Sequence, residues 1–193
     1  MSKTNVGIIG AGGIGSFFIE RINKLIDCDQ LNNFTFTCYD DDIVELKNIL
    51  YQNFTHDDID DYKTEALSFK FTNIETYLNK RATKDDLKTH NLILLCVDNN
   101  VIRKATYENY KENNIPFIDA RSNGKTVGIF SSDTENYYEN LSDSTESFSC
   151  QYPYQLEKKE IELGNVIIAD ILAQKLLNYY RTKNLPENFV YNF

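Results

Sequence analysis

Three glycines near the start of the chain have the spacing of a phosphate-binding turn. They are Gly10, Gly12 and Gly15 of the stretch GIIGAGGIGS, and Gly13 lies within the same turn. At a turn between a strand and a helix, backbone N–H groups and the helix dipole attract an anionic phosphate. We therefore favour a nucleotide as the ligand over a structural role in which the glycines only let the helix pack closely on the strand.

An aspartate at the end of the next predicted strand is the second candidate. Asp40 follows the strand expected at 34–39 and lies 25 residues after Gly15. Its carboxylate can accept hydrogen bonds from the ribose hydroxyls of either NAD or ATP. The glycine turn and Asp40 therefore predict a nucleotide site but do not distinguish the two nucleotides.

Two further stretches distinguish ATP from NAD. They are DDDIVELKNILYQNF, residues 40–54, and CVDNNVIR, residues 96–103. Read with the glycine turn, they resemble the ThiF/MoeB/HesA superfamily of enzymes, which adenylate ubiquitin-like and sulfur-carrier proteins. The resemblance spans residues 5–130 and implies ATP rather than NAD.

The resemblance also implies roles for individual residues. Besides the glycines, the residues implied to bind the nucleotide are Asp40, Asp42, Asn48, Gln52 and Lys63. Asp40 would bind the ribose, Lys63 would face the phosphates, and Asp98 would hold Mg²⁺, so Lys63 and Asp98 are expected to act in catalysis. Attack of a carboxylate on the α-phosphate requires that the charge of the leaving pyrophosphate be neutralised. The implied cofactors are ATP and Mg²⁺.

Each of these residues also has an ordinary structural interpretation. Asp42 and Asn48 are types that cap short helices, Lys63 could be a solvated helix lysine, and Arg103 could be half of a surface ion pair. Their joint order along the chain favours the functional interpretation.

One position departs from the family pattern. Where the family has the arginine of an N-L-x-R-Q motif, this chain has Tyr51. A guanidinium gives a permanent charge and a two-pronged phosphate contact, whereas a phenol gives one neutral hydroxyl. Three alternatives follow: a slower enzyme, a scaffold that binds nucleotide and a protein partner without catalysis, or an enzyme in which Lys47 or Arg21 replaces the arginine.

One cysteine is a candidate nucleophile. Cys150 lies 14 residues before Gly164, and larger members of the superfamily place a thioester-forming cysteine at a similar distance from a glycine-led helix. No neighbouring base is visible that would lower the pKa of its thiol, so thioester formation and a plain loop cysteine both stay open. The four cysteines contain no CxxC pair, which argues against a structural zinc site.

The pattern of apolar residues predicts the elements that position these side chains. We expect strands at 5–9, 34–39, 91–97, 115–119 and 125–130, and helices at 14–26, 62–69, 84–89, 101–112 and 161–180. This alternation predicts an α/β fold: a Rossmann-like, doubly wound, mostly parallel sheet with an antiparallel extension after the fifth strand and ligands at the carboxyl ends of the strands.

We expect residues 1–193 to form a single ThiF-like adenylation domain. Within it, residues 131–155 are expected to form a mobile crossover-type loop, with plain disorder of the polar part as the alternative. The last residues, NLPENFVYNF, fit either a terminal strand or a docking tail.

Composition narrows the class of function. With 20 Lys and Arg against 29 Asp and Glu, the net charge of −9 repels a nucleic-acid backbone. No apolar run approaches the roughly 18 residues of a membrane span, so we expect no membrane association and a cytoplasmic location. The only two histidines, His56 and His90, have no metal-ligand spacing.

The sequence therefore predicts an adenylyltransferase of the ubiquitin-activating type. Its expected substrate is the C-terminal carboxylate of a small ubiquitin-like or sulfur-carrier protein that ends in glycine, and thioester formation on Cys150 could follow. We expect a homodimer. The alternatives are a catalytically weakened ThiF-like scaffold and an NAD-dependent oxidoreductase.

Overall fold

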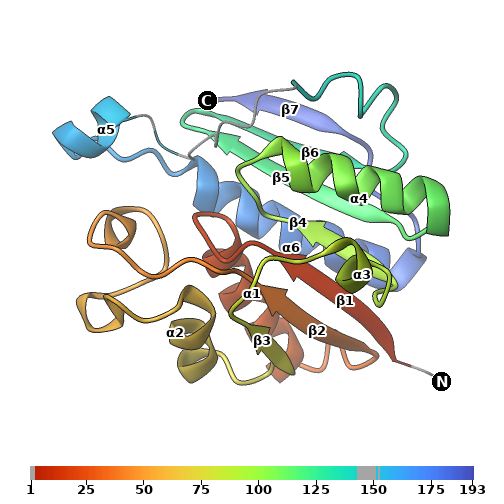
Figure 1. The fold of residues 1–193 in the computed structure, drawn as a ribbon, viewed down its shortest axis with the longest axis horizontal. Coiled ribbons are helices and arrows are strands. Elements are labelled where there is room, and N and C mark those ends of the chain that lie inside the picture. The colour runs from red at the N-terminus through yellow and green to blue at the C-terminus, as the bar shows by residue number, and fades with distance from the viewer. Residues whose placement is uncertain (1–2, 143–150, 152) are drawn as a thin grey trace.

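The described residues form one seven-stranded sheet. The computed structural model describes residues 3–142, 151 and 153–193, and Figure 1 shows the sheet with strand order β3-β2-β1-β4-β5-β6-β7. The strands are β1 (Thr4–Ile9), β2 (Phe34–Tyr39), β3 (Thr76–Leu78), β4 (Leu92–Leu95), β5 (Phe117–Asn123), β6 (Thr126–Ser131) and β7 (Phe189–Asn192). Strands β1 to β5 pair in parallel, whereas β6 and β7 are antiparallel additions. The predicted fold class is confirmed.

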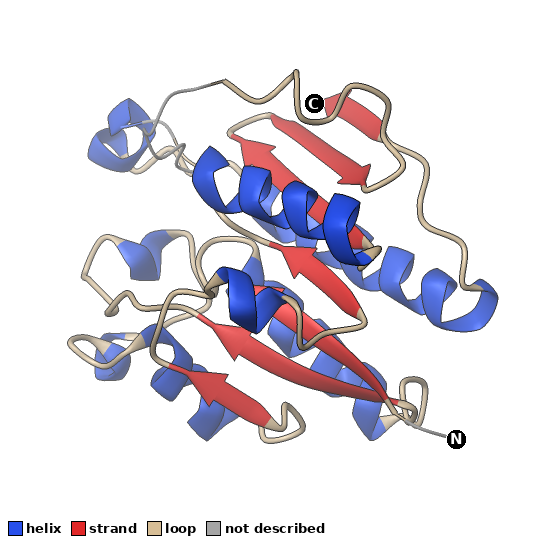
Figure 2. Ribbon diagram, turned by 45° about the vertical axis from the view of Figure 1, so that its right-hand side comes forward, coloured by secondary structure: helices blue, strands red, loops and turns tan. Residues whose placement is uncertain are grey.

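Helices cover both faces of this sheet. They are α1 (Gly15–Asp27), α2 (Lys63–Lys70), α3 (Lys84–Leu87), α4 (Asn100–Asn113), α5 (Pro153–Lys158) and α6 (Gly164–Thr182), with short 3-10 helices at Asn48–Leu50 and His56–Asp58. Figures 1 and 2 show α1 and α6 on one face and α3 and α4 on the other. None of the described helices has both the length and the apolar character that a membrane crossing requires.

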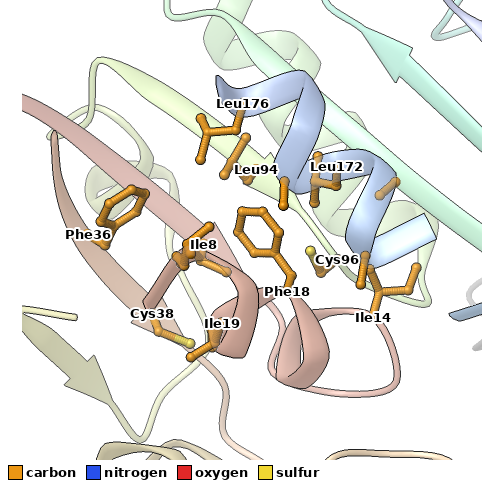
Figure 3. Close-up of a cluster of buried hydrophobic side chains, with 14 of the residues drawn as sticks. Ile8, Ile14, Phe18, Ile19, Phe36, Cys38, Leu94, Cys96, Leu172 and Leu176 are labelled. Atoms are coloured by element: carbon orange, nitrogen blue, oxygen red, sulfur yellow. The ribbon is translucent and has the colours of Figure 1, made fainter. Parts of the chain in front are cut away.

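The largest apolar core lies between β1, β4, α1 and α6. Figure 3 shows Phe18 of α1 facing Leu172 and Leu176 of α6, with Ile8 and Leu94 of the sheet beside it. All five side chains are fully buried. The central strands are apolar without alternation because helices cover both of their faces, as is usual for a parallel sheet.

Two elements at the edges of the sheet differ from the expectation. Strand β3 was not predicted, because three partly exposed residues give too short a pattern to detect. The C-terminal residues form strand β7, which pairs with β6 and so decides between the two alternatives for this segment. Strand β5 also continues to Asn123, four residues beyond its predicted end.

The segment predicted as a polar crossover loop is partly packed against the sheet. Tyr137 and Leu141 are buried, and the ring of Tyr137 stacks on Tyr107 of α4 at 5.8 Å between centroids. Helix α5 begins within the predicted loop range, at Pro153. Residues 143–150 and 152 lie outside the described residues, so the mobility of this loop stays a prediction.

We expect Phe18→Ala to lower the free energy of unfolding by about 3–5 kcal/mol, because it removes a buried ring and leaves a cavity between α1 and α6. Phe69, which is 80% exposed on α2, provides the matched control. Urea unfolding followed by circular dichroism would measure both variants. Equal stability losses for Phe18→Ala and Phe69→Ala would contradict this account of the core.

Candidate functional site

A cavity of about 830 Å³ lies at the carboxyl ends of the central strands. We call it the strand-end cavity. Gly10 after β1, Asp40 after β2 and Asp98 after β4 all line it. Residues far apart in the sequence therefore meet where a doubly wound sheet places its ligands.

The glycines of the β1–α1 turn have different structural requirements. Gly10 has φ +98°, and a Cβ atom there would lie 2.6 Å from the carbonyl oxygen of Cys96. A Cβ atom at Gly15 would lie 1.9 Å from the carbonyl oxygen of Gly10, so these two positions must be glycine for the backbone to pack. At Gly12 a Cβ atom would meet nothing within 4 Å. The packing of the fold therefore does not require glycine at position 12, and the missing side chain leaves space for a ligand.

Of the four glycines implied to bind the nucleotide, three line the cavity. They are Gly10, Gly12 and Gly13, whereas Gly15 is buried at the start of α1 behind them. Gly15 therefore contributes to packing, whereas the other three glycines face the cavity.

Asp40 fastens the end of β2 to the glycine turn. Its Oδ2 accepts a hydrogen bond of 2.7 Å from the backbone N–H of Ala11, and its Oδ1 accepts one of 2.9 Å from Asp42. Burial raises the pKa of Asp40, and the positive charge of Lys63 with the two backbone hydrogen bonds offsets only part of this shift. Each carboxylate oxygen still has a lone pair that a ribose hydroxyl can use.

Lys63 is a buried cation at the wall of the cavity. Its side chain is 7% exposed, and its Nζ lies 2.8 Å from the carboxylate of Asp42, which is 60% exposed. Burial lowers the pKa of Lys63, but the charges of Asp40 and Asp42 outweigh burial, so the net shift of this pKa is upward. The cavity therefore has a fixed positive charge whose partner is an exposed carboxylate.

The segment after Asp42 places three further candidates differently. Gln52 lines the cavity, and its buried Oε1 has no hydrogen-bond partner among the described residues, so this oxygen can accept a hydrogen bond from a ligand. Tyr51 also lines the cavity. Asn48 does not, because its Oδ1 accepts a hydrogen bond of 2.8 Å from the backbone of Glu45 and shapes the turn. The structure favours the structural interpretation for Asn48.

Arg103 holds the turn that follows β4. Its guanidinium donates to the carbonyl oxygen of Val97 at 2.6 Å, and its Nε lies 3.2 Å from the carboxylate of Asp119. The side chain of Asn99 accepts from Ile102 and begins α4. Asp98 thus lies in a turn in which hydrogen bonds hold the residues on both sides of it, Val97 and Asn99. The Arg103 pair is buried, not at the surface as one interpretation of the sequence had it.

Among the residues that the sequence interpretation missed in the lining of the cavity are Tyr39 and the two cations Arg81 and Lys84. The Nε of Arg81 donates to both carboxylate oxygens of Asp41, at 2.8 and 3.0 Å, and the Nζ of Lys84 lies 2.6 Å from Glu108. The signal was the basic stretch KRATK at 80–84, which follows the unpredicted strand β3.

The two cations suggested as replacements for the family arginine lie elsewhere. Lys47 pairs with Glu45, and Arg21 pairs with Asp170 of α6. Neither residue lines the strand-end cavity. The other candidate outside this site, Cys150, lies outside the described residues, so its thioester role stays a prediction.

The family resemblance implies that Asp98 holds Mg²⁺, and this assignment stays a prediction. Within the described part of the chain, no group of three or more His, Cys, Asp or Glu side chains is arranged to hold a metal ion. Mg²⁺ commonly takes one or two protein carboxylates together with substrate phosphates and water. Asp98, which lines the cavity beside the glycine turn, therefore fits an ion that arrives with a nucleotide.

Comparison with known families agrees with this arrangement. The sequence model of the ThiF family matches residues 1–193. The chain belongs to the ThiF family. A comparison with curated proteins found no match.

Solved structures show the same ThiF fold at low sequence identity. PaaA superposes with a TM-score of 0.68 at 18% identity over 98% of this chain and 61% of its own. Escherichia coli MccB with ATP gives 0.62 at 17% over 98% and 63%. Escherichia coli tRNA N6-threonylcarbamoyladenosine dehydratase, TcdA, gives 0.67 at 13% over 93% and 87%. This chain thus spans less than two thirds of the length of PaaA and MccB.

Hydrogen bonds and an ion pair of Asp86 hold the turn that contains Arg81. Asp86 accepts hydrogen bonds from the N–H and hydroxyl of Thr83 at 2.9 and 2.7 Å, and it pairs with Lys80 at 2.7 Å. Burial alone would raise the pKa of Asp86, but Lys80 and Thr83 outweigh it and lower this pKa to about 2.

We expect Asp86→Asn to lower the free energy of unfolding by about 1 kcal/mol at pH 7, through loss of the capping box and of a partly exposed ion pair. A lowered native pKa stabilises the folded state above the unfolded-state value, so the difference from wild type should shrink below about pH 5. Urea unfolding from pH 7 to pH 3 tests this. Asp85→Asn, on the same turn and exposed, is the control, and a difference that grows on acidification would refute the assignment.

Proposed function

We propose that this chain binds Mg·ATP in the strand-end cavity and adenylates a carboxylate of a peptide or small protein. The observation that carries the proposal is the convergence of the glycine turn, Asp40, Lys63 and Asp98 on one cavity in a member of the ThiF family. A nucleotide site needs a turn for phosphates, an acceptor for ribose and cations for charge, and these residues supply each of them.

The arrangement suggests how the nucleotide would lie. Asp40 is next to the glycine turn and would accept from the ribose, while Lys63 and the N–H donors of the Gln52 amide would face the phosphates. Asp98 would hold Mg²⁺. These assignments rest on position and chemical type, and they extend the family resemblance residue by residue.

The reaction needs stabilisation of charge more than a nucleophile from the protein. An oxygen of the substrate carboxylate would attack the α-phosphorus, the bond from this phosphorus to the bridging oxygen would break, and pyrophosphate would leave with the electron pair. Mg²⁺ would supply charge neutralisation at the phosphates. The part of this chain is to hold Lys63 in place before the reaction, because preorganised charge requires no rearrangement when negative charge develops.

The finer proposal concerns the partner. We propose a small ubiquitin-like or sulfur-carrier protein with a C-terminal glycine as substrate, and a homodimer as the assembly. Of the structures with this fold, MccB has been solved with ATP and with N-formylated MccA, which supports a nucleotide and a separate substrate on the same fold. Thioester formation on Cys150 stays part of this finer proposal.

Tyr51 favours a second candidate function. It lines the strand-end cavity where the resemblance leads us to expect an arginine, so the cavity lacks the fixed two-pronged cation of the family pattern. A chain that binds nucleotide and a protein partner without turnover is therefore the alternative to an active enzyme. Carrier-dependent exchange of pyrophosphate separates the two.

We expect Mg·ATP to raise the melting temperature of the wild-type chain, because a ligand of the native state stabilises it by mass action. Gly12→Val should melt at a similar temperature without nucleotide and lose most of this increase, since its side chain would fill space that nothing else occupies. Asp98→Asn should lose the part that depends on Mg²⁺, with Asp133→Asn as the control. A larger increase with NADH than with Mg·ATP would overturn the proposal.

The next prediction concerns the rate of the proposed reaction. Lys63→Met should lower carrier-dependent exchange of pyrophosphate by about 10²- to 10³-fold, as loss of one preorganised charge-stabilising donor typically does. Lys70, on the same helix α2 and paired with Asp58 outside the cavity, is the matched control. If Lys63→Met and Lys70→Met react equally fast, Lys63 does not act on the phosphates.

A further inference from the structure

A second cavity of about 320 Å³ adjoins the first. Strands β5, β6 and β7, the start of α4 and residues 140–142 line it, and it meets the strand-end cavity at Val97, which lines both. We call it the arginine cavity because Arg103 and Arg121 are in its lining. The proposed function does not use it.

The charge of this cavity is opposite to that of the whole protein. The chain has a net charge of −9, yet no Asp or Glu of the described residues lines the arginine cavity. Asp119 lies beneath it, fully buried, with the Nε atoms of Arg103 and Arg121 at 3.2 and 2.6 Å. One carboxylate against two guanidinium groups leaves one positive charge at the wall.

Arg121 is the guanidinium that a ligand can reach. Its side chain is 28% exposed, compared with 6% for Arg103, whose hydrogen bonds go to Asp119, Asn100 and Val97. The guanidinium of Arg121 lies 4.3 Å from the ring centre of Phe130, which holds its plane. A planar, positioned guanidinium is suited to two-pronged binding of a carboxylate.

Ser122, the next residue of β5, does not add to this contact. Successive side chains of a strand point to opposite faces of the sheet, and the Oγ of Ser122 lies 2.9 Å from the position that a Cβ atom of Gly164 on α6 would take. Its hydroxyl therefore faces α6, and Arg121 supplies the charged contact of the cavity.

We propose that the arginine cavity binds an acidic side chain of the substrate, a few residues before the carboxylate that is adenylated. The inference rests on the proposed function for the direction of the substrate. Asp98 and Asn99 line the first cavity, and Asn100 and Arg103 line the second, so the first turn of α4 separates them. An extended chain advances about 3.3–3.6 Å per residue, so a substrate that ends beside Asp98 passes the arginine cavity within a few residues.

The alternative occupants of this cavity fit less well. A neutral side chain would leave the positive charge at the wall without a counter-charge, which is unfavourable where solvent access is reduced. A glutamate or aspartate would pair with the guanidinium of Arg121. The arginine cavity would therefore select the substrate side chain by its charge and not by the fit of an apolar group.

Peptide binding to the full chain without nucleotide tests the inference. The probes are fluorescein-labelled heptapeptides of glycine and alanine with a free C-terminal carboxylate. One Glu stands at each of the four positions before the last residue in turn, and each peptide has a Gln twin. We expect at least one Glu peptide to bind about tenfold more tightly than its twin by fluorescence anisotropy, the size of effect typical of a charged hydrogen bond. The absence of any Glu preference would overturn the inference.

Variants locate the effect. Arg121→Gln should abolish the preference for Glu, and Arg121→Lys, which keeps the charge and loses the fork, should reduce it at least threefold while preserving the fold. Lys125→Gln is the matched control, because Lys125 is an exposed cation on the β5–β6 turn that does not line the cavity. A preference that survives in Arg121→Lys at full size, or that falls equally in Lys125→Gln, would refute the role of Arg121.

Two further measurements separate this inference from the proposed function. Inorganic phosphate that binds with dependence on Arg121, in the absence of any Glu preference, would show a site for free anions and overturn the inference. If the carrier supports pyrophosphate exchange but Glu and Gln peptides bind alike, adenylation stands and the acidic specificity fails. A preference for Glu without exchange would support the specificity and count against adenylation.

Discussion

The close contact between Gly10 and Gly15 is the constraint on which the site depends. A side chain at Gly15 would collide with the carbonyl oxygen of Gly10, and a side chain at Gly10 would collide with Cys96 at the end of β4. The turn can therefore pass between β1 and α1 only with glycine at both positions. Because Asp40 then bonds to the backbone of Ala11, the ends of β1, β2 and β4 are fixed relative to one another. The strand-end cavity is the space that this arrangement leaves open.

In both cavities of this acidic chain, the cations pair with carboxylates of the chain. Lys63 pairs with Asp42 and Arg81 with Asp41, and both carboxylates belong to the run of three aspartates after β2. These exposed partners neutralise the cations less than a buried carboxylate would, since solvent screens an exposed pair. The arginine cavity follows the same arrangement with a difference in number, because buried Asp119 serves two guanidinium groups and leaves one charge over.

The sequence predicts the parts of the fold that have strong periodicity or strict local geometry. The glycine turn, the continuous apolar strand β4 and the long helix α6 are of this kind, and so is the position of Asp40 and Asp98 after strands. Strand β3 escapes prediction because three partly exposed residues have no pattern, and with it Arg81 and Lys84 are lost from the predicted site. The buried group around Asp119 is invisible for another reason: its members come from α4, β5 and the 131–142 segment, and only the tertiary fold brings them together.

The family resemblance leads us to expect an arginine where this chain has Tyr51, so the positive charge of the cavity would come from other residues. Among the described residues that line the strand-end cavity, the cations are Lys63, Arg81 and Lys84. Lys63 is buried and already fixed, whereas the side chain of Arg81 is 82% exposed and still has rotamer freedom to lose. Fixing such a side chain on a phosphate costs up to about 2 kcal/mol, which a preorganised arginine would not have to overcome in full. For the proposed reaction we therefore expect the cavity to be better organised for holding a nucleotide than for stabilising charge that develops during transfer, and we expect turnover, more than binding, to depend on how well Arg81 is ordered once substrate is present.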